Sequence, residues 1–215
     1  MVNLVLAEAE IKHGMHPRNT DFVRKFINGQ KFFIKTGYGV SDTSYQDTKE
    51  MPIYGMGQGV AWAGPAWLMA SNTISKCKEK TCVGFLFKDP LTGTVIRKLE
   101  DFFVDDTAEG CNSTSDGRTI MEQAAHNLQE HVDLVNVTGG DIALDKCDFY
   151  HIQFRFKNGE AECVAMCEQR SSLTILDPNT GRPISIKQMD CDVEHKTLGY
   201  YVNPIGVTKS VSTII

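Results

Sequence analysis

The 215-residue chain lacks several features that would assign it to a class at once. No apolar run approaches the roughly 20 residues that a membrane-spanning helix needs, and the N-terminus has no basic start of a secretory signal. Its seven cysteines have neither the spacing of a disulfide framework nor that of a zinc site. The chain is therefore expected to be cytoplasmic or nuclear, with reduced cysteines and no membrane partner.

A surplus of basic residues is also missing, since the formal net charge is −5. This argues against a free-standing nucleic-acid-binding protein, because such proteins neutralise phosphates with Lys and Arg. The proportions of hydrophobic residues (41%) and charged residues (23%) are ordinary for a globular protein. The length fits one large domain, and the sequence contains no internal repeat.

Local patterns predict an α+β fold with a soft boundary near residue 160, after which short strands dominate. Helices are expected at 2–13, from Asn19 or Thr20 to about 28, at 62–77 and at 119–137. Strands are expected at 31–36, 83–87, 94–104 and 149–156, with a loop or irregular hairpin at 38–50 and turns at 89–93, 157–160 and 177–181.

The most informative segment is an apolar run that ends in two adjacent carboxylates, Asp105 and Asp106. Phe102, Phe103 and Val104 have the character of a buried strand, so the two acids are expected where that strand ends. A tight turn alone would favour Asp there, because its side chain bonds its own backbone. Two carboxylates at the tip of a buried hairpin repel each other, however, and a hard cation such as Mg²⁺ relieves that repulsion.

Other motifs lie before and after this pair. A glycine-rich segment at 55–59 contains Gln58 and Gly59 and precedes an apolar helix pattern. It is not a dinucleotide fingerprint, because Val60 stands where a third glycine is needed. Lys146 lies in a Gly-Gly…Lys-Cys segment at 138–147, and a Leu-Gly…Gly segment follows at 196–206. A lone lysine on a loop is usually only a solvated charge.

In this order the segments resemble motifs B, C, D and E of a retrotransposon reverse transcriptase, over residues 14–206. The resemblance implies an antiparallel palm sheet that contains the Asp-Asp hairpin and is backed by the helices near 62–77 and 119–137. It assigns residues 1–160 to the palm with a remnant of the fingers, and residues 161–215 to a β-rich palm–thumb junction.

The activity that the resemblance implies is RNA-directed DNA synthesis, in which two Mg²⁺ ions assist nucleotidyl transfer from a deoxynucleoside triphosphate to a primer end. The implied partners are a template–primer nucleic acid and the nucleotide, and no oligomeric state is indicated. By this resemblance the metal ligands are Asp105 and Asp106, the substrate contacts are Gln58, Gly59 and Val104, and the general acid is Lys146.

A third carboxylate, which the family carries in motif A on a strand before motif B, has no counterpart here. None of the acids before Gln58 follows an apolar strand pattern; they are Glu8, Glu10, Asp21, Asp42, Asp47 and Glu50. The sequence is therefore expected to be a fragment that starts after motif A. Two alternatives stay open: a catalytically dead relic, and a module that binds a template–primer duplex or a partner polymerase chain. Gly64 also stands where many versions of motif B have Ser.

Overall fold

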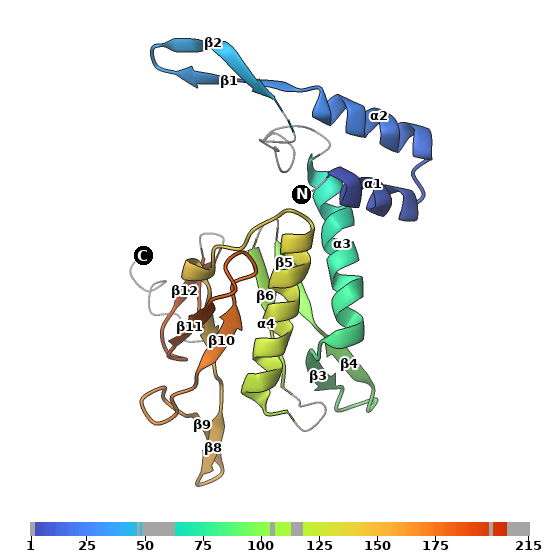
Figure 1. Ribbon diagram of the computed structural model, residues 1–215. Coiled ribbons are helices and arrows are strands. Elements are labelled where there is room, and N and C mark those ends of the chain that lie inside the picture. The colour runs from blue at the N-terminus through green and yellow to red at the C-terminus, as the bar shows by residue number, and fades with distance from the viewer. Residues whose placement is uncertain are drawn as a thin grey trace, which may run out of the picture. The chain divides into compact units, whose positions relative to one another are not determined.

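The computed structural model of the protein describes residues 3–46, 48, 63–103, 106–112, 118–197 and 200–205 (Figure 1). The fold is mixed α+β, as the sequence predicts. The chain forms two compact units, one of residues 1–113 with 127–142 and one of residues 114–126 with 143–215. Residue 160 lies inside the second unit, and the domain assignment based on sequence stays a prediction. Among the helices that the structure describes, none has the length and apolar character to cross a membrane.

The strands of the first unit pair only in antiparallel twos within the described ranges: β1 with β2, β3 with β4, and β5 with β6. A larger antiparallel sheet that joins these pairs is not present in this part of the chain. The elements of the unit are α1 (Asn3–Lys12), α2 (Pro17–Asn28), β1 (Lys31–Thr36), β2 (Gly39–Gln46), α3 (Ala63–Thr81), β3 (Phe85–Lys88), β4 (Val95–Lys98), β5 (Glu100–Phe103), β6 (Asp106–Glu109) and, from residue 127, α4 (Ile120–Val137).

Helix α2 begins earlier than the sequence predicts. The expected caps, Asn19 and Thr20, lie inside its first turn, and His16 is the capping residue. The His16 Nδ1 atom accepts a hydrogen bond from the backbone N–H of Arg18 at 3.2 Å. Pro17 starts the helix because its fixed φ suits the first helical position and its missing N–H would have no helical partner there.

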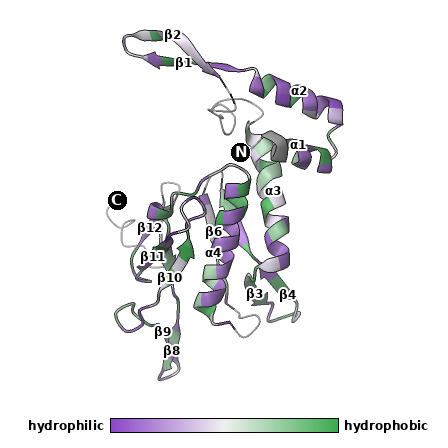
Figure 2. Ribbon diagram, in the orientation of Figure 1, coloured by the Kyte–Doolittle hydropathy of each residue, from purple (hydrophilic) through white to green (hydrophobic). Residues whose placement is uncertain are grey.

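Helix α3 extends four residues beyond the predicted end and carries a buried stripe with a spacing of four. Ala66, Ala70, Ile74 and Lys78 follow one another along this stripe, and each is at most 4% exposed. The helix is more hydrophobic in its first half than near Thr81 (Figure 2). Residues four apart lie on one face of a helix, so the stripe carries the Lys78 side chain into the interior with its apolar neighbours.

The single strand expected at 94–104 is interrupted, and this expectation is corrected. Strands β4 and β5 are separated by Leu99, whose carbonyl accepts a hydrogen bond from the Gly110 N–H at 3.5 Å. Before Leu99 the chain pairs with β3, and after it with β6. The change of partner at Leu99 explains the break, because the two pairings belong to separate ladders.

The most deeply buried line of α4 is polar, although the apolar pattern predicts the helix itself correctly. Gln123, Asn127 and His131 follow one another at a spacing of four and are at most 5% exposed. In the first unit, the Asn127 side chain satisfies the backbone of Val83: its Oδ1 accepts from Val83 N–H at 3.2 Å and its Nδ2 donates to Val83 O at 2.6 Å. Such bonds explain why polar side chains are stable in the interior.

The second unit is built around a three-stranded sheet in the order β10-β11-β7, in which β11 pairs antiparallel with β10 and parallel with β7. Leu173, Ile175 and Ile186 form its buried face. The elements of this unit, besides the start of α4, are η1 (Leu144–Lys146), β7 (Asp148–Tyr150), β8 (Phe154–Lys157), β9 (Glu160–Cys163), β10 (Leu173–Leu176), β11 (Pro183–Met189), β12 (His195–Thr197) and β13 (Tyr200–Val202).

The strand expected at 149–156 is also wrong as a single element. It divides into β7 and β8, because β7 joins the sheet through β11 whereas β8 pairs with β9. His151 lies at the break, where its Nδ1 shares a hydrogen bond with Ser171 Oγ at 2.5 Å. The turn expected at 157–160 is confirmed: Asn158 and Gly159 have φ values of 53° and 85°, the positive values that a two-residue hairpin turn requires.

Candidate functional site

The predicted carboxylate pair falls at a hairpin. Phe103, the last residue of β5, pairs with Asp106, the first residue of β6, so the two strands flank Val104 and Asp105. Asp106 is exposed. Val104 and Asp105 themselves lie outside the described residues, as do Gln58 and Gly59. The expected strand before the pair is therefore present, and Asp106 itself begins the strand that follows, while the positions of four predicted site residues stay predictions.

Lys146, the predicted general acid, is the last residue of the short helix η1 and is exposed. It belongs to the second unit, whereas Asp106 belongs to the first. Its expected role at the leaving pyrophosphate stays a prediction.

The base of the same hairpin carries a second carboxylate pair, which the sequence analysis missed. Glu100 in β5 lies directly opposite Glu109 in β6. Like charges that face each other across two strands destabilise a sheet, so a cation is needed between them. The sequence did not indicate this pairing, because the two acids at the tip would place residue 100 opposite residue 111, whereas the pairing of Phe103 with Asp106 sets residue 100 opposite residue 109.

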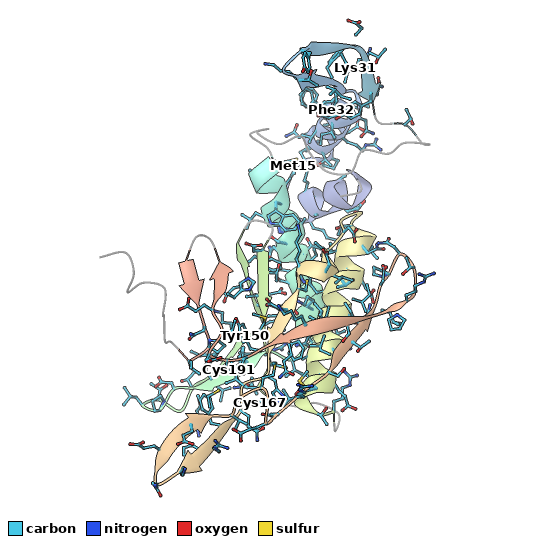
Figure 3. All side chains as sticks on the ribbon, turned by 90° about the vertical axis from the view of Figure 1, so that its left-hand side faces the viewer. Met15, Lys31, Phe32, Tyr150, Cys167 and Cys191 are labelled. Carbon is cyan, nitrogen blue, oxygen red and sulfur yellow. The ribbon has the colours of Figure 1, made fainter. Side chains whose placement is uncertain are left out.

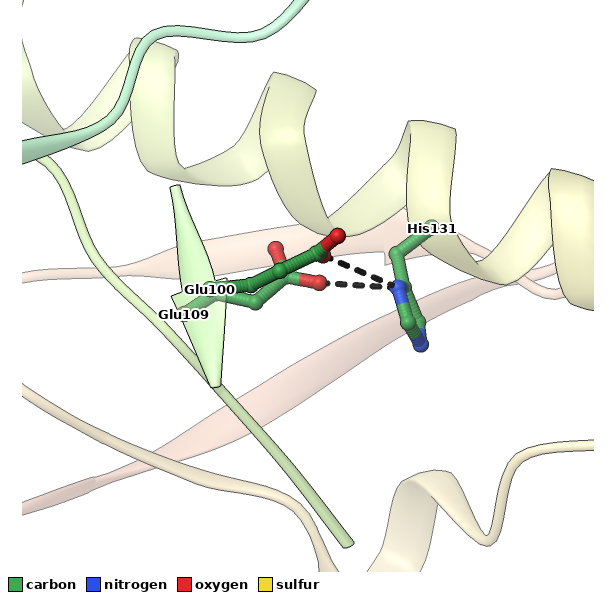
Figure 4. Close-up of side chains that lie close together, drawn as sticks. All are labelled: Glu100, Glu109 and His131. Carbon is green, nitrogen blue, oxygen red and sulfur yellow. Dashed lines mark ion pairs between the residues drawn. The ribbon is translucent and has the colours of Figure 1, made fainter. Parts of the chain in front are cut away.

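Two basic side chains neutralise this pair. The Lys78 ammonium group, from α3, hydrogen-bonds Glu100 Oε2 and Glu109 Oε1. The His131 ring, from α4, brings its Nδ1 to 2.9 Å from Glu109 Oε1 and 3.8 Å from Glu100 Oε2 (Figure 4). We call these four residues the charged cluster. Their side chains are 0% exposed for Lys78, 4% for Glu100, 7% for His131 and 15% for Glu109.

Neighbouring side chains hold the cluster in place. Ser75, one turn before Lys78, donates a hydrogen bond to Glu100 Oε1 at 2.6 Å. The Phe102 ring lies with its centroid 6.0 Å from that of His131. Glu109 Oε2 is buried and has no hydrogen-bond partner among the described residues. The cluster thus joins two helices and two strands, and one carboxylate oxygen has no partner within the described part.

Glu109 is held ionised by this environment. Burial raises the pKa of its carboxyl group, but the hydrogen bond from His131 and the charges of Lys78 and His131 outweigh that effect and leave the pKa below 4.5. His131 Nδ1 is also 3.2 Å from Lys78 Nζ. One nitrogen cannot donate to Glu109 and accept from Lys78 together. The shorter distance to Glu109 assigns His131 Nδ1 as the donor to the Glu109 carboxylate.

Within the described residues, one group of three side chains has the spacing of metal ligands: Glu100, Glu109 and His131, whose ligand atoms lie within 4.8 Å of one another. Two carboxylates and an imidazole suit Zn²⁺ better than Mg²⁺. The Lys78 ammonium group, however, already bonds both carboxylates. A metal ion would have to displace a buried lysine, so the cluster as it stands carries its own cation.

The described acids before the glycine-rich segment lie on two helices and on one exposed strand. Glu8 and Glu10 lie in α1, and Glu10 is 1% exposed. Asp21, in α2, forms ion pairs with Arg24 at 2.8 Å and Lys25 at 2.7 Å. Asp42 is exposed on β2, which pairs with β1 and with no strand near the Asp-Asp hairpin. Asp47 and Glu50 lie outside the described residues.

Comparisons with known proteins gave no match: no family model, no curated protein and no solved structure is similar to the chain at a significant level. The functional assignment therefore rests on the residues and the geometry of the chain itself.

Proposed function

We propose that this chain is a reverse-transcriptase-like palm, in which the tip of the β5–β6 hairpin holds the Mg²⁺ ions for nucleotidyl transfer. The observation that carries the proposal is the hairpin itself, with Asp106 exposed at the start of β6 and paired with Phe103 at the end of β5. Further support comes from α3, which follows the glycine-rich segment directly, as the resemblance to motif B implies.

The chemistry of the donors fits this assignment. Exposed carboxylates suit Mg²⁺, which prefers oxygen ligands, keeps several waters and relies on substrate phosphates to complete its shell. When bound, the ions would activate the primer hydroxyl group and stabilise the leaving pyrophosphate. The residues of this chain would hold them through Asp105 and Asp106, seat the nucleotide with Gln58, Gly59 and Val104, and supply a proton from Lys146.

A catalytically silent palm is the second candidate, favoured by the missing third carboxylate. The described acids before Gln58 lie in α1, in α2 or on the exposed strand β2. Two-metal catalysis depends on charge held in position, so the loss of a metal-bridging carboxylate should remove many powers of ten in rate. A module that binds a template–primer duplex or a partner polymerase chain would use the same fold without catalysis.

Primer extension tests the proposal. The 215 residues alone should give no detectable extension of a labelled primer with deoxynucleotides and Mg²⁺ or Mn²⁺. A version lengthened at its N-terminus by a strand that ends in Asp should extend the primer, and Asp105→Ala should abolish that activity. The matched control is Asp101→Ala, an exposed acid on the same hairpin, which should leave extension unchanged.

One result would contradict this proposal, and another would support it while it changes the expected set of metal ligands. A lengthened chain that stays inactive, although folded, would favour the silent palm. Robust extension by residues 1–215 alone, with sensitivity to Asp105→Ala, would mean that one of the early acids serves as the third ligand, and the expectation of a fragment would then be wrong.

A further inference from the structure

The chain contains two Asn-Gly dipeptides, and the structure gives them opposite surroundings. They are Asn28-Gly29 at the end of α2 and Asn158-Gly159 in the turn between β8 and β9. An asparagine before glycine is prone to lose its side-chain amide, because glycine has no side chain to hinder the attack of its backbone nitrogen on the asparagine amide carbon. The surroundings of that nitrogen therefore determine which pair reacts.

The Asn158-Gly159 turn is accessible. Both residues are exposed, and a Cβ atom added at Gly159 would meet nothing within 4 Å among the described residues. In the described part of the chain, Asn158 is also the only residue other than glycine with a positive φ, at 53°. This left-handed conformation is unfavourable for most residues with a side chain, so the pairing of the two strands is needed to hold it.

Few buried contacts stabilise those strands. β8 pairs with β9 alone, and the residues of both strands are exposed apart from the half-buried Cys163. Phe154 and Phe156 are 53% and 79% exposed, and the ion pair between Arg155 and Glu162 is about half exposed. Figure 3 and Figure 1 both show the hairpin projecting from the sheet of its unit. A two-stranded hairpin of this kind is only marginally stable, so its turn opens readily.

The Asn28-Gly29 pair is held by a helix instead. The Gly29 N–H donates a hydrogen bond to Lys25 O at 3.0 Å, and the Gln30 N–H donates to Ile27 O at 3.1 Å. A Cβ atom added at Gly29 would lie only 3.1 Å from Lys25 O. The glycine nitrogen must lose its proton before it can attack, and the carbonyl oxygen that accepts this proton would repel the resulting anion.

We propose that Asn158 is a site of spontaneous deamidation, at which the β8–β9 turn acquires an aspartate or isoaspartate residue, while Asn28 reacts much more slowly. The site is independent of the polymerase chemistry proposed above. Its reaction uses only water and hydroxide ion, and it needs neither an enzyme nor an oxidant.

The reaction has two steps. Hydroxide removes the proton of the Gly159 N–H, the nitrogen attacks the Asn158 Cγ atom, and the Cγ–Nδ2 bond breaks as ammonia leaves with a proton from water. The product is a five-membered succinimide ring. Water then opens the ring at either of its two carbonyl groups. One opening gives aspartate, and the other gives isoaspartate, in which the main chain runs through the side-chain carboxyl carbon.

Isoaspartate lengthens the main chain of a turn that has only two residues. The register of Lys157 opposite Glu160 depends on the length of this turn, so isoaspartate should open the hairpin from its tip. Aspartate should keep the hairpin, because Asp tolerates the left-handed conformation as Asn does. Both products add a negative charge, and isoaspartate also weakens the strand pairing.

The test stores the full chain at mildly alkaline pH and follows two tryptic peptides, residues 26–31 with Asn28 and residues 158–170 with Asn158. Digestion at mildly acidic pH limits further reaction. The mass gain from amide to acid should appear about tenfold faster in the second peptide, because attack at Asn28 requires helical hydrogen bonds to break. Guanidinium chloride should remove the difference by accelerating the reaction at Asn28, since both pairs are alike in the unfolded chain.

Variants give a matched comparison. Asn158→Gln should abolish the mass gain in its peptide, because glutamine would have to form a larger ring, and Asn28→Gln should leave that gain unchanged. An isoaspartyl methyltransferase should label the stored chain far more than stored Asn158→Gln. Amide hydrogen exchange over residues 154–163 should be faster in the stored chain than in fresh Asn158→Asp.

Equal rates at Asn28 and Asn158 in the folded chain would overturn the proposal. A rate at Asn158 that guanidinium chloride raises as much as the rate at Asn28 would also overturn it, because the turn would then be protected by the fold. Both measurements use the unaltered chain, so neither depends on whether a variant folds.

Discussion

The two ends of the β5–β6 hairpin differ in how the negative charge of their carboxylates is balanced. At its base, Glu100 and Glu109 both form an ion pair with the buried Lys78, and Glu109 also lies 2.9 Å from His131 Nδ1. At its tip, Asp106 is exposed to solvent. Carboxylates that already bond an internal lysine do not need an external cation, whereas an exposed carboxylate such as Asp106 can accept one. The base of the hairpin therefore stabilises the fold, and its tip is the better candidate for metal binding and catalysis.

The largest effect is expected from removal of the internal cation. Lys78→Met retains the length of the side chain but leaves two buried carboxylates with only His131 between them. Breaking a buried charge network in this way costs about 3–5 kcal/mol. Urea unfolding at pH 7 should show this loss, while the exposed Lys76→Met on the same helix should change stability by less than about 0.5 kcal/mol.

The double variant of Lys78→Met with Glu100→Gln should recover part of this loss, because it also removes one of the repelling charges. Equal stability of Lys78→Met and Lys76→Met would show that the cluster is solvated in solution and would remove the contrast between base and tip.

A measurement of Mg²⁺ binding compares the base and the tip of the hairpin directly. The carboxylates of Asp105 and Asp106, with water, should bind Mg²⁺ more weakly than about 1 mM in the free protein. Calorimetry should show that Asp105→Asn loses this binding, while Glu100→Gln keeps it. Micromolar affinity in the unaltered chain would reveal a third ligand at the tip. Binding that Glu100→Gln removes and Asp105→Asn retains would move the metal site to the base of the hairpin.

Sequence patterns located the hairpin and the helices behind it, because apolar runs and helical spacing record burial directly. The stripe of α3 was readable up to Ile74. The burial of its last member, Lys78, could not be predicted, because a lysine at such a position is normally solvated. The structure shows that Lys78 is 0% exposed. What makes Lys78 buried is a pair of glutamates more than twenty residues later, and hydropathy in a local window cannot record such a distant partner.

The breaks in the predicted strands also result from partners that are distant in the sequence. Residues 149–156 alternate as a single strand would, yet β7 and β8 find their partners in β11 and β9 respectively. Pairing with distant segments determines where a strand ends, so a local pattern predicts its presence better than its bounds. The charged cluster could not be predicted from the sequence, because a turn at Asp105 and Asp106 would place residue 100 opposite residue 111, whereas the pairing of Phe103 with Asp106 places it opposite Glu109.

The pH dependence of stability should reflect the base of the hairpin rather than its tip. Because the pKa of Glu109 is lowered from 4.5 in the folded protein, its contribution is fully present above the unfolded value and is lost as the pH falls through the folded value. The unaltered chain should therefore lose more stability than Glu109→Gln between roughly pH 5 and pH 3.

Urea unfolding over this pH range provides the measurement, with the exposed Glu79→Gln on α3 as the control. Carboxyl groups such as Asp89 and Asp177, whose pKa values are lowered by hydrogen bonds within turns, are common to all three proteins and cancel. If the free energy of unfolding depended on pH in the same way for the unaltered chain and for Glu109→Gln, the cluster would not stabilise the ionised form of Glu109.

The smallest effect concerns the end of α3 that is remote from Lys78. A Cβ atom added at Gly64 would meet nothing within 4 Å among the described residues, whereas one at Gly140 would lie 2.8 Å from Val135 Cγ1. Gly64→Ser should thus raise the free energy of unfolding by about 0.5 kcal/mol through reduced backbone entropy of the unfolded chain. Gly140→Ser should lower it. A destabilised Gly64→Ser would mean that this end of α3 is covered, unlike the exposed hairpin tip.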